Sequence, residues 1–115
     1  MLFVLYCDTM EIEWETEKLK QKAMDLAKRN PVTARHMDAA KSAKDFRDIE
    51  PPTNGRAHFL KYDYKGYFSI DLESKTRPGR LICKPTGDFK IQDSQYIKST
   101  ITSFKVIKID KNYHK

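Results

Sequence analysis

The stretch RAHFLKYDYKGYFSIDL, residues 56–72, is typical of an antiparallel β-hairpin. Residues 57–62 and 67–72 are rich in the aromatic and branched side chains that favour strands, and residues 63–66 between them end in glycine and form a turn. In the second strand every other side chain is apolar, so one face of the hairpin is expected to be buried. The hairpin therefore predicts that the second half of the chain consists of β-strands.

The segment before the hairpin has helical periodicity instead. A polar–apolar alternation at residues 11–15 predicts a first strand, and a threonine suited to N-capping opens a helical pattern over residues 16–29. Asn-Pro at the start of residues 30–44 predicts a second helix, because proline is preorganised for the first helical position. The sequence PPTNG, residues 51–55, then breaks the chain.

The segment after the hairpin predicts further strands. Residues 74–79 form a turn, residues 80–84 a strand and residues 103–109 the last strand. The polar residues 85–100 between them have no clear period, although residues 95–98 could pair weakly.

The order of these elements predicts one α+β domain over residues 1–115. An N-terminal strand and a helical hairpin precede a three- to four-stranded antiparallel sheet, with the helices packed on one face. Residues 1–9 are a possible N-terminal extension, since Met10 could also be the natural start.

Composition excludes several classes of protein. A chain of 115 residues with 39% hydrophobic residues has material for one modest core. Its two cysteines, Cys7 and Cys83, are too far apart in the sequence for a CxxC zinc site and too few for a disulfide scaffold, which suggests a reducing compartment. No apolar run approaches a membrane span, and the short run at residues 2–6 does not make a signal peptide. We therefore expect a cytoplasmic protein that makes no use of a membrane.

Positive charge is concentrated in the second half of the chain. Residues 1–55 contain 9 Lys and Arg against 10 Asp and Glu, whereas residues 56–115 contain 13 against 6, so the net charge of +6 comes from the second half. Tyrosine and phenylalanine are interleaved with these cations. Such a composition is expected of a surface that binds nucleic acid, although ordinary solubilising charge over an aromatic core would look the same.

The same hairpin resembles a known family. Residues 56–61, RAHFLK, and 64–70, YKGYFSI, are similar to the central hairpin of toxins of the RelE/ParE superfamily, most closely the HigB branch, the killer toxins of plasmid maintenance systems. An arginine that opens the family's next strand is matched at residues 80–82, RLI. The family's terminal Asp-Tyr-His has a counterpart in residues 110–115, DKNYHK. The resemblance covers about residues 10–115.

The resemblance implies a RelE-like fold and a toxin that cuts mRNA on translating ribosomes, without a metal or other cofactor, and so inhibits translation. It also implies a cognate HigA-like helix-turn-helix antitoxin, with operator DNA bound only through the toxin–antitoxin complex. The matched positions are the candidate catalytic residues: His58, Lys61, Arg80, Tyr113 and His114. The candidate RNA-binding residues are Arg56, Lys65, Arg77 and Lys84.

These residue types suit metal-free RNA cleavage. The ribose 2′-OH attacks the adjacent phosphate, which requires a base, an acid and cations to hold the charge of the transition state. Histidines can act as acid or base near neutral pH, and Lys and Arg supply fixed charge. His36 has no partner in the pattern and is interpreted as structural or surface, and the three histidines lack metal-ligand spacing. Asn112 stands where the family commonly has Asp, and Asp110 could substitute for it.

Two other interpretations remain open from the sequence. One is a ParE-like toxin that poisons DNA gyrase by binding it, which has no need of an acid–base pair. The other is a non-catalytic RNA-binding or regulatory domain whose aromatic side chains stack on bases, an option that Asn112 leaves open. Replacing His58 or His114 separates them, since only the nuclease depends on these imidazoles.

Overall fold

The computed structural model describes residues 9–50, 56–61, 64–72 and 79–110. The elements in chain order are β1 (Glu11–Trp14), α1 (Glu17–Arg29), α2 (Pro31–Ser42), the 3-10 turn η1 (Phe46–Asp48), β2 (Ala57–Phe59), β3 (Phe68–Asp71), β4 (Arg80–Pro85), β5 (Ile91–Gln92), β6 (Gln95–Tyr96), the 3-10 turn η3 (Lys98–Thr100) and β7 (Ser103–Asp110). These elements make an α+β fold, as the sequence predicts. No helix within these ranges has the length and apolarity needed to cross a membrane.

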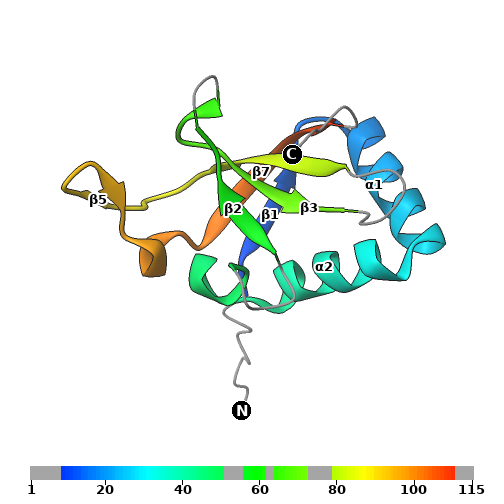
Figure 1. The fold of residues 1–115 in the computed structure, drawn as a ribbon, viewed down its shortest axis with the longest axis horizontal. Helices are drawn as coiled ribbons and strands as arrows, with labels where there is room; N and C mark the ends of the chain where they lie inside the picture. Colours follow the sequence, from blue (N-terminus) through cyan, green and yellow to red (C-terminus); the bar gives the residue numbers. More distant parts are fainter. Residues whose placement is uncertain (1–8, 51–55, 62–63, 73–78, 111–115) are drawn as a thin grey trace, which may run out of the picture.

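The main sheet has five strands in the order β1-β7-β4-β3-β2. The pairs β2–β3, β3–β4 and β4–β7 are antiparallel, which matches the predicted antiparallel sheet. Strand β1 pairs in parallel with β7, so the sheet as a whole is mixed. Helices α1 and α2 separate β1 from the other strands along the chain. Figure 1 shows the helices gathered at one side and the β5–β6 hairpin projecting at the other.

Local signals account for both helices. The Thr16 hydroxyl accepts a hydrogen bond from the Leu19 backbone N–H at 3.0 Å and so caps α1. Asn30 does not cap α2 as its position suggests. Its side-chain Nδ2 instead donates to the Leu26 carbonyl at 3.1 Å, closing the end of α1, and Pro31 alone opens α2. Helix α2 ends at Ser42, two residues before the predicted end.

The predicted hairpin is present with a shorter first strand. Strand β2 ends at Phe59, although the Leu60 N–H still donates to the Tyr67 carbonyl at 3.0 Å. The Tyr67 N–H donates to the Tyr64 carbonyl at 2.9 Å in the connecting turn, where Gly66 takes a positive φ of 92°. The weak pairing expected near residues 95–98 appears as the separate two-stranded sheet β5–β6.

The core lies between the helices and one face of the sheet. Phe46 from η1 stacks on Phe59 with ring centroids 4.4 Å apart and meets Phe68 edge-on at 5.0 Å. Phe68 in turn contacts Phe104 of β7 at 5.2 Å. Phe46, Phe68 and Phe104 are almost completely buried. This aromatic cluster fixes β2 and β3 against the rest of the sheet and so fixes where their outward side chains stand.

A charge pair stabilises η1, the turn that places Phe46 in the core. Asp45 is buried, and its carboxylate accepts hydrogen bonds from Arg47 Nε at 3.0 Å and Nη2 at 2.9 Å, which lowers the pKa of that carboxyl. Asp45→Asn keeps an oxygen for the Arg47 backbone N–H and removes the charge and the acceptor for Arg47 Nη2. Because the Arg47 side chain is exposed, we expect a loss of about 0.5–1 kcal/mol in the free energy of unfolding at neutral pH.

The lowered pKa of Asp45 predicts how the stability difference between wild type and Asp45→Asn changes with pH. A lowered folded-state pKa stabilises the fold above the unfolded value of about 3.9, and that contribution is lost as pH falls through the folded value. Chemical denaturation should therefore show the full difference between wild type and Asp45→Asn at neutral pH and a shrinking one in acid. Asp38→Asn on the exposed side of α2 is the control. An equal difference at both pH values would contradict the assignment.

Candidate functional site

The candidate site lies on the outer face of the sheet, which is the face turned away from α1 and α2. Directly paired residues of neighbouring strands share a face, so the register identifies two rows of side chains across β2, β3, β4 and β7. The first row is His58, Ser69, Ile82 and Lys108. The second row is Asp71, Arg80 and Asp110. A histidine, an arginine and a lysine thus share this face of the sheet, on which Ser69 and Ile82 between them are buried.

His58 is one of three groups gathered at the edge strand β2. His58 Nε2 lies 3.8 Å from Asp71 Oδ2, and Arg56 Nε lies 3.8 Å from the same oxygen. The side chains of Arg56 and His58 are about half exposed, at 52% and 46%. We call these three residues the His58 cluster. In this cluster the Asp71 carboxylate lies between an accessible imidazole and a solvent-facing guanidinium.

The backbone of Arg56 supports a functional role for the cluster. Its φ of 56° is in the left-handed region, which costs a non-glycine residue of this kind about 1–2 kcal/mol. The Ala57 N–H that follows donates to the Ile49 carbonyl at 2.7 Å and holds the chain in this turn. The Arg56 side chain reaches Asp71, and residues kept in such backbone conformations concentrate at functional sites.

Arg80 and Asp110 form the second charged group of the outer face. Arg80 opens β4, and its Nε and Nη2 both lie 3.2 Å from Asp110 Oδ2. Both side chains are largely buried, at 17% and 20% exposure. Arg80 also stands beside Asp71 in the register, so the His58 cluster and the Arg80–Asp110 pair adjoin through Asp71.

A bulge in β7 adds Lys108 to the same face. Val106 pairs with Cys83 and Lys108 with Ile82, which leaves Ile107 as an extra residue. Lys108 Nζ lies 5.4 Å from the centroid of the Tyr64 ring. The Tyr64 phenol, and to a smaller degree Asp110, raises the pKa of Lys108. Lys108 is therefore a fixed cation at neutral pH. Three strand spacings, about 14 Å, separate it from His58.

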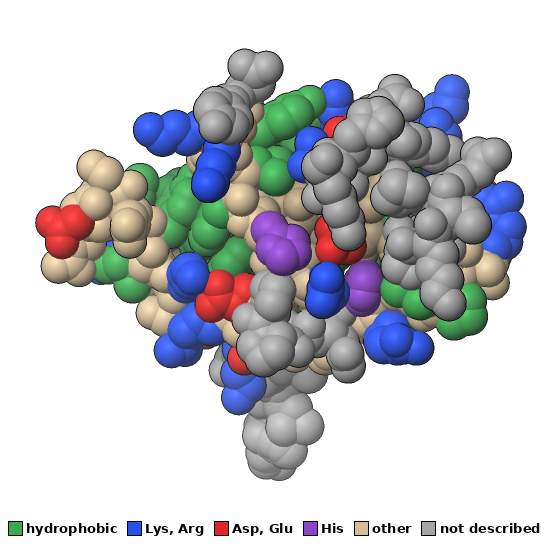
Figure 2. Space-filling model, viewed as in Figure 1, with side chains coloured by type: hydrophobic (Ala, Val, Ile, Leu, Met, Phe, Trp, Pro, Cys, Tyr) green, Lys and Arg blue, Asp and Glu red, His purple; other side chains and the backbone are tan. Residues whose placement is uncertain are grey.

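His36 has the structural role that the sequence allowed. It is buried on α2, and its Nδ1 lies 2.5 Å from the Asp71 carbonyl oxygen. A carbonyl only accepts, so Nδ1 carries the proton. His36 thus ties α2 to the end of β3, directly behind the Asp71 carboxylate that faces His58. Figure 2 shows two histidine side chains on one surface with acidic and basic side chains beside them.

The remaining candidates are not part of this arrangement. Lys61 and Lys65 are exposed near the hairpin turn, and no contact joins them to the His58 cluster. Lys84 is exposed on β4 and pairs in register with Lys105, farther along the outer face. Arg77, Tyr113 and His114 lie outside the described residues, as does Cys7.

Two residues of the site carry no clear signal in the sequence. Asp71 is one polar residue in an alternating strand, and only the pairing of β3 with β2 brings it beside Arg56 and His58. Lys108 has the same parity as the buried Val106, so a regular strand would turn both to the core. The bulge at Ile107 reverses that parity, and bulges are set by tertiary pairing.

The site has the chemistry of proton transfer and anion binding. Among the described residues no three His, Cys, Asp or Glu side chains gather as metal ligands would. Comparisons with models of known families, with curated proteins and with solved structures found no match for the chain.

Proposed function

We propose that this protein is the toxin of a type II toxin–antitoxin pair and acts as a metal-independent endoribonuclease that cuts mRNA on the ribosome. The observation that carries the proposal is the accessible imidazole of His58 beside Asp71 and Arg56, with Arg80 adjoining on the same face. These residues supply one proton-transfer group and the cations that 2′-OH attack on a phosphate requires.

Within this proposal His58 exchanges a proton with the reacting ribose or leaving oxygen. Half of its side chain is exposed, so a substrate can reach Nε2. Asp71 Oδ2 lies 3.8 Å from Nε2, close enough to orient the imidazole ring. Asp110 is hydrogen-bonded to Arg80, and Asp71 is the carboxylate that lies beside the His58 imidazole.

The cations of the outer face hold the phosphate. Arg56 offers a solvent-facing guanidinium next to His58, and Arg80 is fixed by Asp110 and can stabilise charge without reorganising. Lys108 and Lys84 extend positive charge along the face, where flanking phosphates would lie.

The second acid–base group in this proposal is His114, supported by Tyr113. His114 follows Asp110 by four residues in the sequence, and four residues span at most about 14 Å. The end of β7 at Asp110 adjoins Arg80, so a group tethered there is within reach of the second row. Lys61, Lys65 and Arg77 are assigned to the RNA on either side of the cut.

The same proposal implies the cellular setting. A basic surface that cuts RNA endangers its own cell, so we propose a HigA-like helix-turn-helix antitoxin as the partner and cytoplasmic action on translating ribosomes. Operator DNA would be bound through the toxin–antitoxin complex alone.

The direct test is a coupled translation reaction to which purified protein is added. We expect breaks within the codons of translated mRNA, mapped as new 5′ ends, and far fewer breaks in the same RNA without ribosomes. Loss of gyrase supercoiling activity with intact mRNA would instead support a gyrase poison. RNA that is bound but never cut would support a non-catalytic domain, and either outcome would contradict the proposal.

A further inference from the structure

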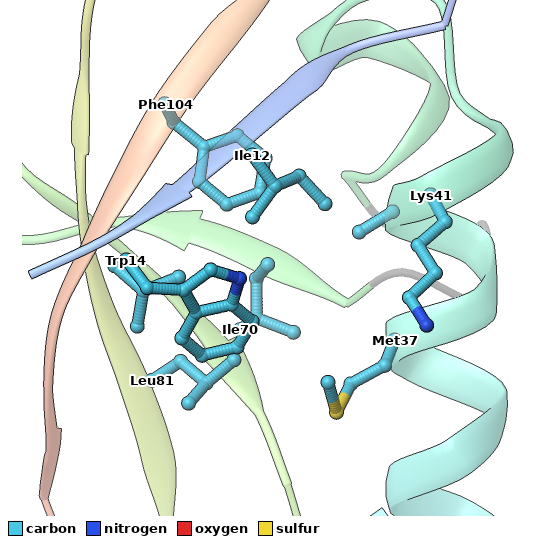
Figure 3. A pocket seen from close by; sticks show the side chains of 9 residues that line it. Ile12, Trp14, Met37, Lys41, Ile70, Leu81 and Phe104 are labelled. Carbon is cyan, nitrogen blue, oxygen red and sulfur yellow. The ribbon is translucent and has the colours of Figure 1, made fainter. Parts of the chain in front are cut away.

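A cavity of about 160 Å³ lies between α2 and the core face of the sheet, near the edge strand β1 (Figure 3). Its walls are apolar side chains from β1, α2, β3, β4 and β7, among them Ile12, Met37 and Leu81. Ile12 is only partly buried, which indicates that the cavity opens at the β1 edge. The space is on the opposite face of the sheet from His58 and Arg80.

Two hydrogen-bond donors border this apolar space. Figure 3 shows the indole nitrogen of Trp14 on the side of the ring that faces α2, with the Lys41 side chain extending along α2 beside the cavity. Lys41 is exposed, which places its ammonium group at the mouth. Within the ranges that the structure describes, neither side chain donates a hydrogen bond, and no carboxylate lies within 4.0 Å of the Lys41 ammonium.

We propose that this cavity binds a small monocarboxylic acid with an apolar body of about six carbons. Apolar cavities of about 150 Å³ stay dry and accept a benzene-sized guest, so the volume fits such a body. The carboxylate would remain at the mouth beside the Lys41 ammonium, and the Trp14 N–H is a second donor on the opposite wall. A neutral apolar guest would leave both donors unused, and a larger acid would not fit.

The cavity lies on the core face of the sheet, opposite the second row of Asp71, Arg80 and Asp110 on the outer face. Ile70 and Leu81 line it, and their sequence neighbours Asp71 and Arg80 face the opposite side of the sheet. A bound acid would therefore be separated from the outer face by the thickness of one sheet. The inference does not depend on the proposed nuclease activity, because it concerns different side chains and its test needs no RNA.

The single tryptophan of the chain makes the test direct. Trp14 lines the cavity, so its fluorescence reports on the occupant without labelling. We expect cyclohexylacetate, which does not absorb where Trp emits, to change the emission saturably at concentrations up to about 10 mM. Lys41→Met should weaken this binding about fivefold, the expected effect of losing an exposed charge pair. Lys44→Met, three residues further on and away from the cavity, should leave it unchanged.

The neutral analogue 2-cyclohexylethanol separates the apolar part from the charge. We expect it to bind more weakly than the acid and to be indifferent to Lys41→Met. Ala40→Leu, which fills the cavity from α2, should abolish binding while circular dichroism confirms the fold. If that variant does not fold, Lys41→Glu at the exposed mouth tests the same point by repelling the acid. No saturable change, or equal binding of acid and alcohol in both wild type and Lys41→Met, would overturn the proposal.

Discussion

His58→Gln is expected to lower the rate of RNA cleavage by about 10²–10⁴-fold, the usual contribution of a general acid or base. His58 is half exposed on an edge strand, and Asp71 Oδ2 lies 3.8 Å from its Nε2. Glutamine keeps a polar side chain of similar size but cannot exchange a proton near neutral pH. Because the imidazole contributes little packing, the melting temperature should stay nearly unchanged. Single-turnover cleavage and thermal unfolding measure the two effects separately.

His36→Asn is the matched control for this substitution. It removes the other described histidine but can keep a donor where Nδ1–H meets the Asp71 carbonyl. We expect a modest loss of stability because His36 is buried, with cleavage per folded molecule within a few-fold of wild type. Wild-type cleavage by His58→Gln would contradict the assignment. So would an equal loss in folded His36→Asn.

Arg80→Met is expected to lower cleavage by about 10²–10³-fold, the typical cost of removing one preorganised group that stabilises transition-state charge. Methionine matches the length of the apolar part of arginine, so the effect reports mainly on the guanidinium. The loss should fall on kcat more than on KM, because a cation fixed by Asp110 acts on charge that develops during the reaction. Steady-state kinetics of mRNA cleavage on programmed ribosomes distinguishes the two parameters.

A structural role for Arg80 must be separated from a catalytic one. Arg80→Met leaves the largely buried Asp110 carboxylate without this guanidinium, which costs stability of its own. The double variant Arg80→Met/Asp110→Asn should recover much of that stability and none of the cleavage. If activity returned together with stability, Arg80 would be a structural residue and the phosphate-binding assignment would be wrong.

Local chemistry made much of the fold predictable. The helix boundaries follow from Thr16 and Pro31, each of which acts through its own backbone geometry or side-chain oxygen. The strands of the hairpin follow from the alternation around Phe68 and Ile70, both of which are buried. These signals depend on neighbours within a few residues, so a sequence can display them.

The features of the fold and the site that the sequence did not predict depend on pairing between strands that are distant in the chain. Nothing near Trp14 indicates that β1 pairs in parallel with β7, because the partner lies some ninety residues later in the chain. The bulge at Ile107 and the approach of Asp71 to His58 are consequences of register between strands. The types of residue at the site were predictable from the sequence. Their carboxylate partner was not, because it depends on the register between strands.

The most direct test of the central claim, cleavage by an internal 2′-OH on the outer face, uses an RNA with a single 2′-deoxy nucleotide at the mapped cut position. Purified wild-type protein on translating ribosomes is expected to cut the all-ribose RNA and leave a 2′,3′-cyclic phosphate, and to leave the substituted position intact while cutting elsewhere. Cleavage that continues at the deoxy position would contradict the account, because no 2′-OH would be present there to attack.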